Sequence, residues 1–299
     1  MLLAYLQLAG AMVLAGATVA VAKPVVAAVP VYVFGFLRFA IVAAILVPLA
    51  LRNGRPRAVP WRDLAVAVLL SFFGAFLFTV LILEGVARTS AVDAALITST
   101  IPAATLLLSA VVLGERLTAR RCGAVALATA GIAVIALQNA ADGGARSLLG
   151  NLLVVGAVFS EAMFTVLAKR VGARLAPVPL AAITGVAATA MFLPLATLQV
   201  VQDGWPAIDA GIWTLIVFYS TAGSVVAFLL WFEGLRKADA GIAGAFTALI
   251  PVSGALIAVV GLGEHFTSGH LAALGLALLA IALATRPERP DPERLTGSA

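Results

Sequence analysis

Cysteine, histidine and charged residues are all scarce in this sequence, and each scarcity excludes a class of protein. The single cysteine, Cys122, rules out a disulfide framework and a multi-cysteine metal site. The two histidines, His265 and His270, leave few ligands for zinc or haem. Only 11% of the 299 residues are charged, whereas soluble domains average about 25%. We therefore expect no bound metal, no cofactor and no compact soluble fold.

Motifs of catalysis and of nucleic-acid binding are equally scarce. The sequence has no glycine-rich phosphate loop, no paired histidines, and no serine, histidine and carboxylate in a pattern typical of hydrolases. Its 19 Lys and Arg residues give a formal net charge of +5, but they are scattered between apolar runs instead of forming one basic patch. We predict no catalytic residues, no enzyme activity and no nucleic-acid partner.

Hydrophobic residues are abundant: they make up 63% of the chain, and the mean hydropathy is +1.11. A membrane-spanning helix needs about 20 apolar residues, and helices satisfy their own backbone hydrogen bonds in lipid. We therefore predict an all-α polytopic membrane protein, embedded in the lipid bilayer and followed by a polar, disordered tail at 286–299. Its ten transmembrane helices are expected at residues 2–22, 31–51, 63–86, 91–113, 121–139, 148–168, 177–200, 211–235, 240–262 and 269–285.

The basic residues are distributed unevenly between the two sides of the predicted membrane. Fifteen of the 19 fall on the same side as the N-terminus, three fall on the other side, and Arg38 lies inside a span. Cytoplasmic loops carry an excess of Lys and Arg. The distribution therefore predicts that both termini are cytoplasmic.

The second half of the sequence repeats the first. With a shift of 149 residues, Glu84-Gly85 meets Glu233-Gly234 and Leu113-Gly114-Glu115 meets Leu262-Gly263-Glu264; earlier in each half the shift is 146. We predict two domains of five helices each, at 1–140 and 147–285. An odd number of helices inverts the second copy relative to the first, which is typical of secondary transporters with a site near the membrane midplane.

Each half also contains a proline followed by Gly-Glu and Thr, as in Pro102…Gly114-Glu115…Thr118 and Pro251…Gly263-Glu264…Thr267. Two inverted five-helix halves with this motif resemble the EamA-like branch of the drug/metabolite transporter superfamily, and the resemblance covers about residues 4–285. Length and loop pattern are compatible with the bacterial amino-acid exporters of this branch, including aromatic amino-acid exporters of the YddG type. The resemblance implies a facilitative or proton-coupled exporter in the bacterial cell inner membrane, with a central cavity lined from both halves.

Two charged residues inside predicted spans are candidate substrate-binding residues, because an ionised group there is costly unless it faces protein or water. Glu161 could bind a substrate amine or carry a proton, or it could be a structural carboxylate that snorkels toward the cytoplasmic interface. Arg38 could bind a substrate carboxylate, pair with Glu161, or snorkel to the lipid headgroups.

Pro102 and Pro251 fall in the middle of predicted spans, where each removes a hydrogen bond from the carbonyl four residues earlier. These carbonyls belong to Thr98 and Thr247, which are themselves repeat-equivalent. We predict that the prolines are hinges and that the threonines are polar groups of the substrate site. The alternative is an ordinary kink in which the hydroxyl bonds back to its own helix.

Small and aromatic residues share a face in two further spans. Ser71 and Phe78 follow a helical spacing, as do Ser224 and Trp231, and Tyr219 lies close by. Such faces could line a cavity for a flat ring, or they could be packing residues and lipid-facing aromatics. We expect a cavity at the repeat interface, lined from spans 1, 3, 4, 6, 8 and 9.

These observations predict a small-molecule transporter that exports amino acids, with aromatic or bulky neutral ones favoured, or similar small metabolites by alternating access. The alternative is a proton-coupled efflux transporter for drugs or organic cations, with Glu161 as its carboxylate. A sugar-phosphate exchanger ranks last, because Arg38 is the one cation that falls in the interior of a predicted span, away from its ends. A scaffold or receptor has no need of paired prolines inside its spans. The sequence leaves both a monomer and a homodimer open.

Overall fold

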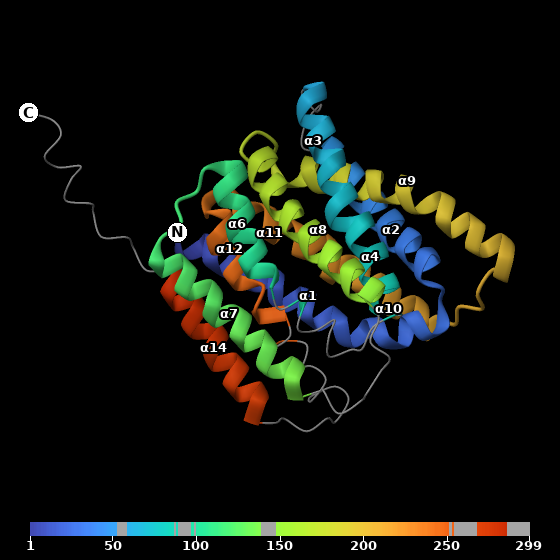
Figure 1. The fold of residues 1–299 in the computed structure, drawn as a ribbon. Helices are drawn as coiled ribbons and strands as arrows, with labels where there is room; N and C mark the ends of the chain where they lie inside the picture. The colour runs from blue at the N-terminus through green and yellow to red at the C-terminus, as the bar shows by residue number, and fades with distance from the viewer. Residues whose placement is uncertain are drawn as a thin grey trace, which may run out of the picture.

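The protein is described by a computed structural model, which covers residues 1–52, 59–86, 88, 97–98, 100–138, 148–250, 253 and 268–285. Within these ranges the regular elements are helices, which pack into a bundle (Figure 1). Five of the described helices are long and apolar enough to cross a membrane: Val31–Arg52, Trp61–Ile82, Leu148–Gly172, Pro177–Asp203 and Ala210–Lys237. Further apolar helical stretches cover Leu2–Thr18, Ile101–Leu113 and Leu274–Thr285.

The helices of the first half follow the predicted spans closely. Residues 91–96, in the predicted span 91–113, lie outside the described residues. Three consecutive elements, α3, η1 and α4, form one long helix with a π-helical segment in its middle. In chain order the elements are α1 (Leu2–Ala28), α2 (Val31–Arg52), α3 (Trp61–Ser71), η1 (Phe72–Leu77), α4 (Phe78–Val86), α6 (Ile101–Leu113) and α7 (Ala119–Gln138).

The second half has the same order of elements. Its long helix with a π-helical segment consists of α10, η2 and α11, and most of 251–262 in the predicted span 240–262 lies outside the described residues. The elements are α8 (Leu148–Gly172), α9 (Pro177–Asp203), α10 (Ala210–Ser220), η2 (Thr221–Val226), α11 (Ala227–Lys237), α12 (Ala240–Phe246) and α14 (Ser268–Thr285).

The two π-helical segments were not predicted, and they begin 149 residues apart, which is the shift of the repeat. Each holds a glycine against which another helix packs: Phe164 of α8 lies against Gly74, and Thr18 of α1 lies against Gly223. A Cβ atom on either glycine would collide with that side chain, so the close approach requires glycine. π-helical turns often mark functional sites. Each segment lies halfway along its long helix, so we expect a functional site at that level of the bundle.

Glycines also bring two equivalent pairs of helices together. A Cβ on Gly85 of α4 would lie 2.7 Å from Cγ2 of Val154 in α8, and one on Gly234 of α11 would lie 2.9 Å from Cγ of Leu8 in α1. These glycines let α4 approach α8 and α11 approach α1.

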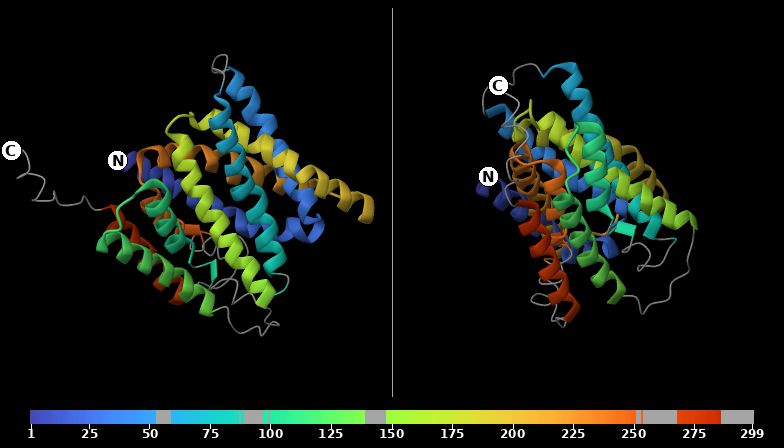
Figure 2. Two further views of the ribbon diagram at one scale, coloured as in Figure 1. Left: turned by 45° about the horizontal axis from the view of Figure 1, so that its top comes forward. Right: turned by 60° about the vertical axis from the view of Figure 1, so that its left-hand side comes forward.

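Helices α7 and α14 lie side by side along one edge of the bundle in every view (Figures 1 and 2). Small buried residues make this contact: Ala128 of α7 clusters with Ala277 of α14, and Ala124 clusters with Ala284. Residues of this size let two helices pack closely in lipid. These alanines therefore allow the close contact between α7 and α14.

We expected Pro102 to kink the middle of a helix, and it does not. It is the second residue of α6, in the first turn, where a missing N–H leaves no helical hydrogen bond unmade. The expectation of a kink inside a continuous helix is therefore wrong at this position. Pro251 lies outside the described residues.

Candidate functional site

A cavity of about 340 Å³ lies inside the bundle, between α1, α2, α4, α8 and the helix formed by α10, η2 and α11. It extends from Met12 and Trp231 to Val26 and Val31. The last two residues lie at the end of the bundle where α1 ends and α2 begins, which we call the mouth end. Small-molecule sites usually enclose about 300–1,000 Å³, so this cavity is the candidate substrate site.

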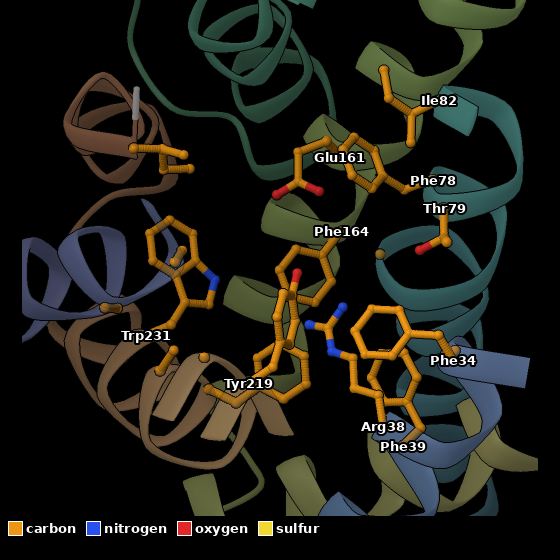
Figure 3. A pocket seen from close by; sticks show the side chains of 18 of the residues that line it. Phe34, Arg38, Phe39, Phe78, Thr79, Ile82, Glu161, Phe164, Tyr219 and Trp231 are labelled. Carbon is orange, nitrogen blue, oxygen red and sulfur yellow. The ribbon is translucent and has the colours of Figure 1, made fainter. Parts of the chain in front are cut away.

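Arg38 of α2 supplies the positive charge of the cavity (Figure 3). Its Nε donates a hydrogen bond of 2.8 Å to Oγ of Ser224 in η2. Its guanidinium carbon lies 4.7 Å from the ring centre of Phe39 and 4.8 Å from that of Tyr219, within the range of cation–π contacts. These contacts hold the guanidinium in one orientation, with its terminal nitrogens toward the cavity (Figure 3).

Glu161 of α8 supplies a carboxyl group. Its side chain lines the same cavity and is partly buried (Figure 3). One alternative from the sequence was an ion pair with Arg38, but in the described part of the chain Arg38 bonds to Ser224 and not to Glu161. The two ionisable groups therefore stand separately on the cavity wall.

Aromatic rings form much of the remaining wall. Phe39 stacks on Phe192 of α9 with ring centres 5.9 Å apart, and Phe34 meets Tyr219 edge-on at 5.2 Å. Further rings come from Phe78, Phe164, Phe228 and Trp231. One cation, one carboxylate and an aromatic wall together suit a small zwitterion with an apolar side chain.

Repeat-equivalent positions recur around the cavity wall. Gly74 faces it from the first half and Gly223 from the second. Glu161, however, is equivalent to Ala15, and Trp231 is equivalent to Ile82. The cavity wall therefore uses equivalent positions of both halves, but the side chains at these positions differ in chemistry.

Five of the nine predicted substrate-binding residues line the cavity: Arg38, Phe78, Glu161, Tyr219 and Trp231. Ser224 lies behind this wall, where it holds Arg38. Ser71 lies elsewhere, because its hydroxyl donates to the carbonyl of Thr184 in α9 at 2.9 Å. The reason is the π-helical segment after Ser71, which changes the helical spacing on which the prediction relied.

Thr98 and Thr247 are also outside the residues that line the cavity. The hydroxyl of Thr247 donates to the carbonyl of Gly244 at 2.7 Å, and its own carbonyl accepts from the N–H of Ile250 at 3.0 Å. The expected free carbonyl is therefore wrong at Thr247. Its hydroxyl bonds back to its own helix, as the alternative interpretation stated.

The opposite end of the bundle, where α6 and α11 end and α7 and α12 begin, is held by polar contacts, and we call it the latch end. Gly114 ends α6 in the left-handed conformation, with a φ angle of 70°, which favours glycine. The next residue, Glu115, reaches α12: its carboxylate accepts from the N–H of Ala240 at 2.7 Å and from that of Gly241 at 3.0 Å. The Gly-Glu motif thus joins α6 to the N-terminus of α12.

Two basic residues extend this set of contacts. Arg121 of α7 lies 3.7 Å from Glu115 and pairs with Asp239. Lys169 of α8 donates to the carbonyl of Leu235 at 2.9 Å in the last turn of α11, where the helix carries partial negative charge. The latch end is therefore tied together across five helices, while the cavity extends toward the mouth end.

The mouth end carries one polar cluster of its own. The hydroxyl of Tyr32 donates to Glu84 at 3.1 Å, Arg88 pairs with the same carboxylate, and the N–H of Tyr32 donates to Gln199 at 3.2 Å. Glu84 therefore connects α4 with α2.

Sequence reasoning missed the aromatic residues that α2 and α9 contribute to the cavity, namely Phe34, Phe39 and Phe192. Phe34 lies one helical turn before Arg38 on α2, so the spacing of four residues could have assigned it to the same face. Phe192 carries no such signal, because α9 is apolar on all sides around it.

Comparison with known proteins agrees with this arrangement. The EamA-like transporter family matches the chain twice, over residues 2–137 and 148–286. The uncharacterized transporter YetK of Bacillus subtilis (strain 168) is 31% identical over 278 residues, which cover 92% of this chain and 83% of that protein. A probable terminal-alkyne amino-acid exporter of Streptantibioticus cattleyicolor is 30% identical over 217 residues, which cover 73% of this chain and 70% of that protein.

One solved crystal structure superimposes with a TM-score of 0.78 at 22% identity, covering 94% of this chain and 96% of the other, which shows a shared fold. The family and these relatives are transporters and not enzymes, and the apolar helices make this chain an integral membrane protein. The two family matches together span nearly all of the sequence, so the chain belongs to the EamA-like transporter family.

Proposed function

We propose that this protein exports amino acids, with aromatic or bulky neutral ones favoured, or similar small metabolites, by alternating access. The observation that carries the proposal is the cavity in which Arg38 and Glu161 face the same space without pairing, among aromatic rings. An α-amino acid offers the three complementary parts. Its carboxylate binds Arg38, its ammonium group binds Glu161, and its side chain packs against the rings.

Charge matching supports a zwitterion over a simple ion. A carboxylate on the guanidinium and an ammonium group on the carboxylate each form charge-assisted hydrogen bonds. A lone cation or anion leaves one of the two cavity charges unpaired in a poorly solvated place, which is costly. The relative from Streptantibioticus cattleyicolor, a probable terminal-alkyne amino-acid exporter, supports the same substrate class.

Two features support alternating access between inverted five-helix repeats. Equivalent contacts recur in both halves, since Gly85 packs on Val154 as Gly234 packs on Leu8. The latch end is tied by polar contacts while the cavity extends toward the mouth end. With both termini in the cytoplasm of a bacterial cell, as the basic residues indicate, the latch end is cytoplasmic and the mouth end is periplasmic.

The test is counterflow in proteoliposomes with labelled amino acids, a quaternary-ammonium dye and a sugar phosphate. We expect exchange of neutral amino acids, fastest for aromatic or bulky ones, and none of the sugar phosphate. Transport of the dye without any amino acid would contradict the proposal. An imposed proton gradient in the same vesicles distinguishes proton coupling from facilitated exchange.

The second candidate function is proton-coupled efflux of drugs or organic cations, and the carboxylate of Glu161 beside aromatic rings favours it. The fixed positive charge of Arg38 in the same cavity opposes it. Glu161→Gln separates the two: loss of the response to a proton gradient supports a proton carrier, whereas weaker amino-acid binding without any such response supports an amine-binding role. Glu233→Gln, which changes a partly exposed carboxylate on α11 that pairs with Arg236 and lies outside the cavity wall, is the matched control.

A further inference from the structure

Trp231 presents a buried polar group that the proposed zwitterion site does not use. The residue lies in α11, is only 3% exposed, and its side chain lines the cavity. Its indole Nε1 is buried and has no hydrogen-bond partner among the described residues. Figure 3 shows this nitrogen on the side of the ring that faces the labelled side chains of Phe164 and Tyr219.

An unpaired indole N–H inside a cavity is unusual, because a buried tryptophan normally finds an acceptor for it. Leaving a buried donor without a partner destabilises the protein. The group is a donor only, so the matching ligand atom must be an acceptor such as an ether, hydroxyl or carbonyl oxygen.

The position of Trp231 relates this acceptor to a part of the substrate. Arg38 is on α2 and Glu161 is on α8, whereas Trp231 projects from α11 across the cavity from Arg38 (Figure 3). Met12 and Phe228 line the same cavity with Trp231 and are apolar. A molecule held by its two charged groups at Arg38 and Glu161 therefore extends its side chain toward the indole.

We propose that the indole N–H of Trp231 is a specificity determinant, which selects amino acids whose side chain carries a hydrogen-bond acceptor. This inference rests on the proposed amino-acid function and narrows its substrate class. A purely hydrocarbon side chain of the same shape fills the same space but leaves the N–H unpaired. An ether or carbonyl in the side chain pairs with it.

The test uses pairs of amino acids that differ only in one acceptor atom: O-methylhomoserine against norleucine, and O-methyltyrosine against 4-ethylphenylalanine. Within each pair an oxygen replaces a methylene group, so the number of heavy atoms and the zwitterion are unchanged. The ratio of their transport efficiencies in proteoliposome counterflow measures the contribution of the acceptor alone. We expect this ratio to fall by about 3- to 10-fold when the indole N–H is removed, the size of one neutral hydrogen bond.

Two variants remove the N–H. Trp231→Phe keeps an aromatic ring, and replacement of Trp231 by 3-benzothienylalanine keeps the full bicyclic shape with sulfur in place of the N–H, so a packing defect in the first does not affect the second. Trp213→Phe is the control, since Trp213 is exposed on α10 and is not part of the cavity wall.

The outcomes are distinct. A reduced ether-to-hydrocarbon ratio in both Trp231 variants, with the control unchanged, supports the inference. An unchanged ratio overturns it. An equal loss of transport efficiency for both members of each pair also overturns it, because the N–H would then donate to the amino-acid backbone, or the ring would act only through packing. If the unmodified protein exchanges no amino acid at all, the proposed function fails together with this inference.

Discussion

Glu115→Gln tests whether the latch end holds the protein in the described conformation. Both carboxylate oxygens of Glu115 accept backbone hydrogen bonds, from Ala240 at 2.7 Å and from Gly241 at 3.0 Å. Glutamine keeps one acceptor oxygen but directs an NH₂ group at the other N–H, and it removes the negative charge from the N-terminus of α12.

The magnitude follows from these contacts. One charge-assisted hydrogen bond in a poorly exposed place contributes about 1.5–3 kcal/mol, and the charge at the helix N-terminus contributes about 0.3–1 kcal/mol. The side chain of Glu115 is only 10% exposed, so solvent screening is small. The closed form of the latch end should therefore lose about 2–4 kcal/mol, which shifts the closed-to-open ratio by about 30- to 700-fold.

Thiol labelling measures this shift. Ser109 of α6 is fully buried near Gly241, below the contact that Glu115 makes, and Ser109→Cys in a Cys122→Ser background places one thiol there. When opening is fast relative to labelling, the rate with a polar maleimide is proportional to the open population. We expect Glu115→Gln to raise that rate at least about 30-fold, and Glu233→Gln to leave it unchanged. A rate within twofold of the parent would refute the role of the latch end.

Three further predictions address the site, the packing and the topology. Arg38→Met should raise the KM for a neutral amino acid by about 10- to 100-fold, because the charge-assisted bond to the substrate carboxylate is lost; unchanged amino-acid counterflow kinetics would contradict this role. Gly74→Ala should destabilise the protein in detergent by about 1–3 kcal/mol, because the new methyl group collides with Phe164 of α8. Gly275→Ala is the control: nothing lies within 4 Å of its new methyl group, so the melting temperature should stay unchanged or rise. Equal melting temperatures of Gly74→Ala and the parent protein would show that the close approach at Gly74 is relieved without cost. Reporter fusions after Arg174 and Asp203 should report cytoplasm and periplasm respectively, and the reverse result would invert the proposed topology.

The apolar runs located the helices well, because a membrane-spanning helix must be continuous and apolar over about 20 residues. The runs could not show where hydrogen bonding departs from the α pattern. Both π-helical segments lie inside long, predominantly apolar spans, and the one that follows Ser71 is why that residue was assigned to the wrong side of its helix. Pro102 was placed inside a helix for a similar reason, since an apolar run does not show that α6 begins at Ile101.

The charged and polar members of the cavity were easier to find than the apolar ones. Arg38 and Glu161 stand out, because an ionised group inside a span needs a reason to be there. Phe192 does not stand out, because the apolar helix around it carries no periodic signal that separates its cavity face from its lipid face. The chain has 15 phenylalanines. The location of Phe39 and Phe192 at the cavity becomes evident only from the packing of α2 against α9.

The most direct test of the zwitterion site is the binding of three matched ligands to the purified protein: phenylalanine, its amide, which lacks the carboxylate, and its N-acetyl derivative, which lacks the ammonium group. We expect phenylalanine to bind at least about 10-fold more tightly than either derivative. The penalty for the amide should disappear in Arg38→Met, and the penalty for the N-acetyl derivative should disappear in Glu161→Gln. Equal binding of all three ligands, or tightest binding of the cationic amide, would contradict the zwitterion site.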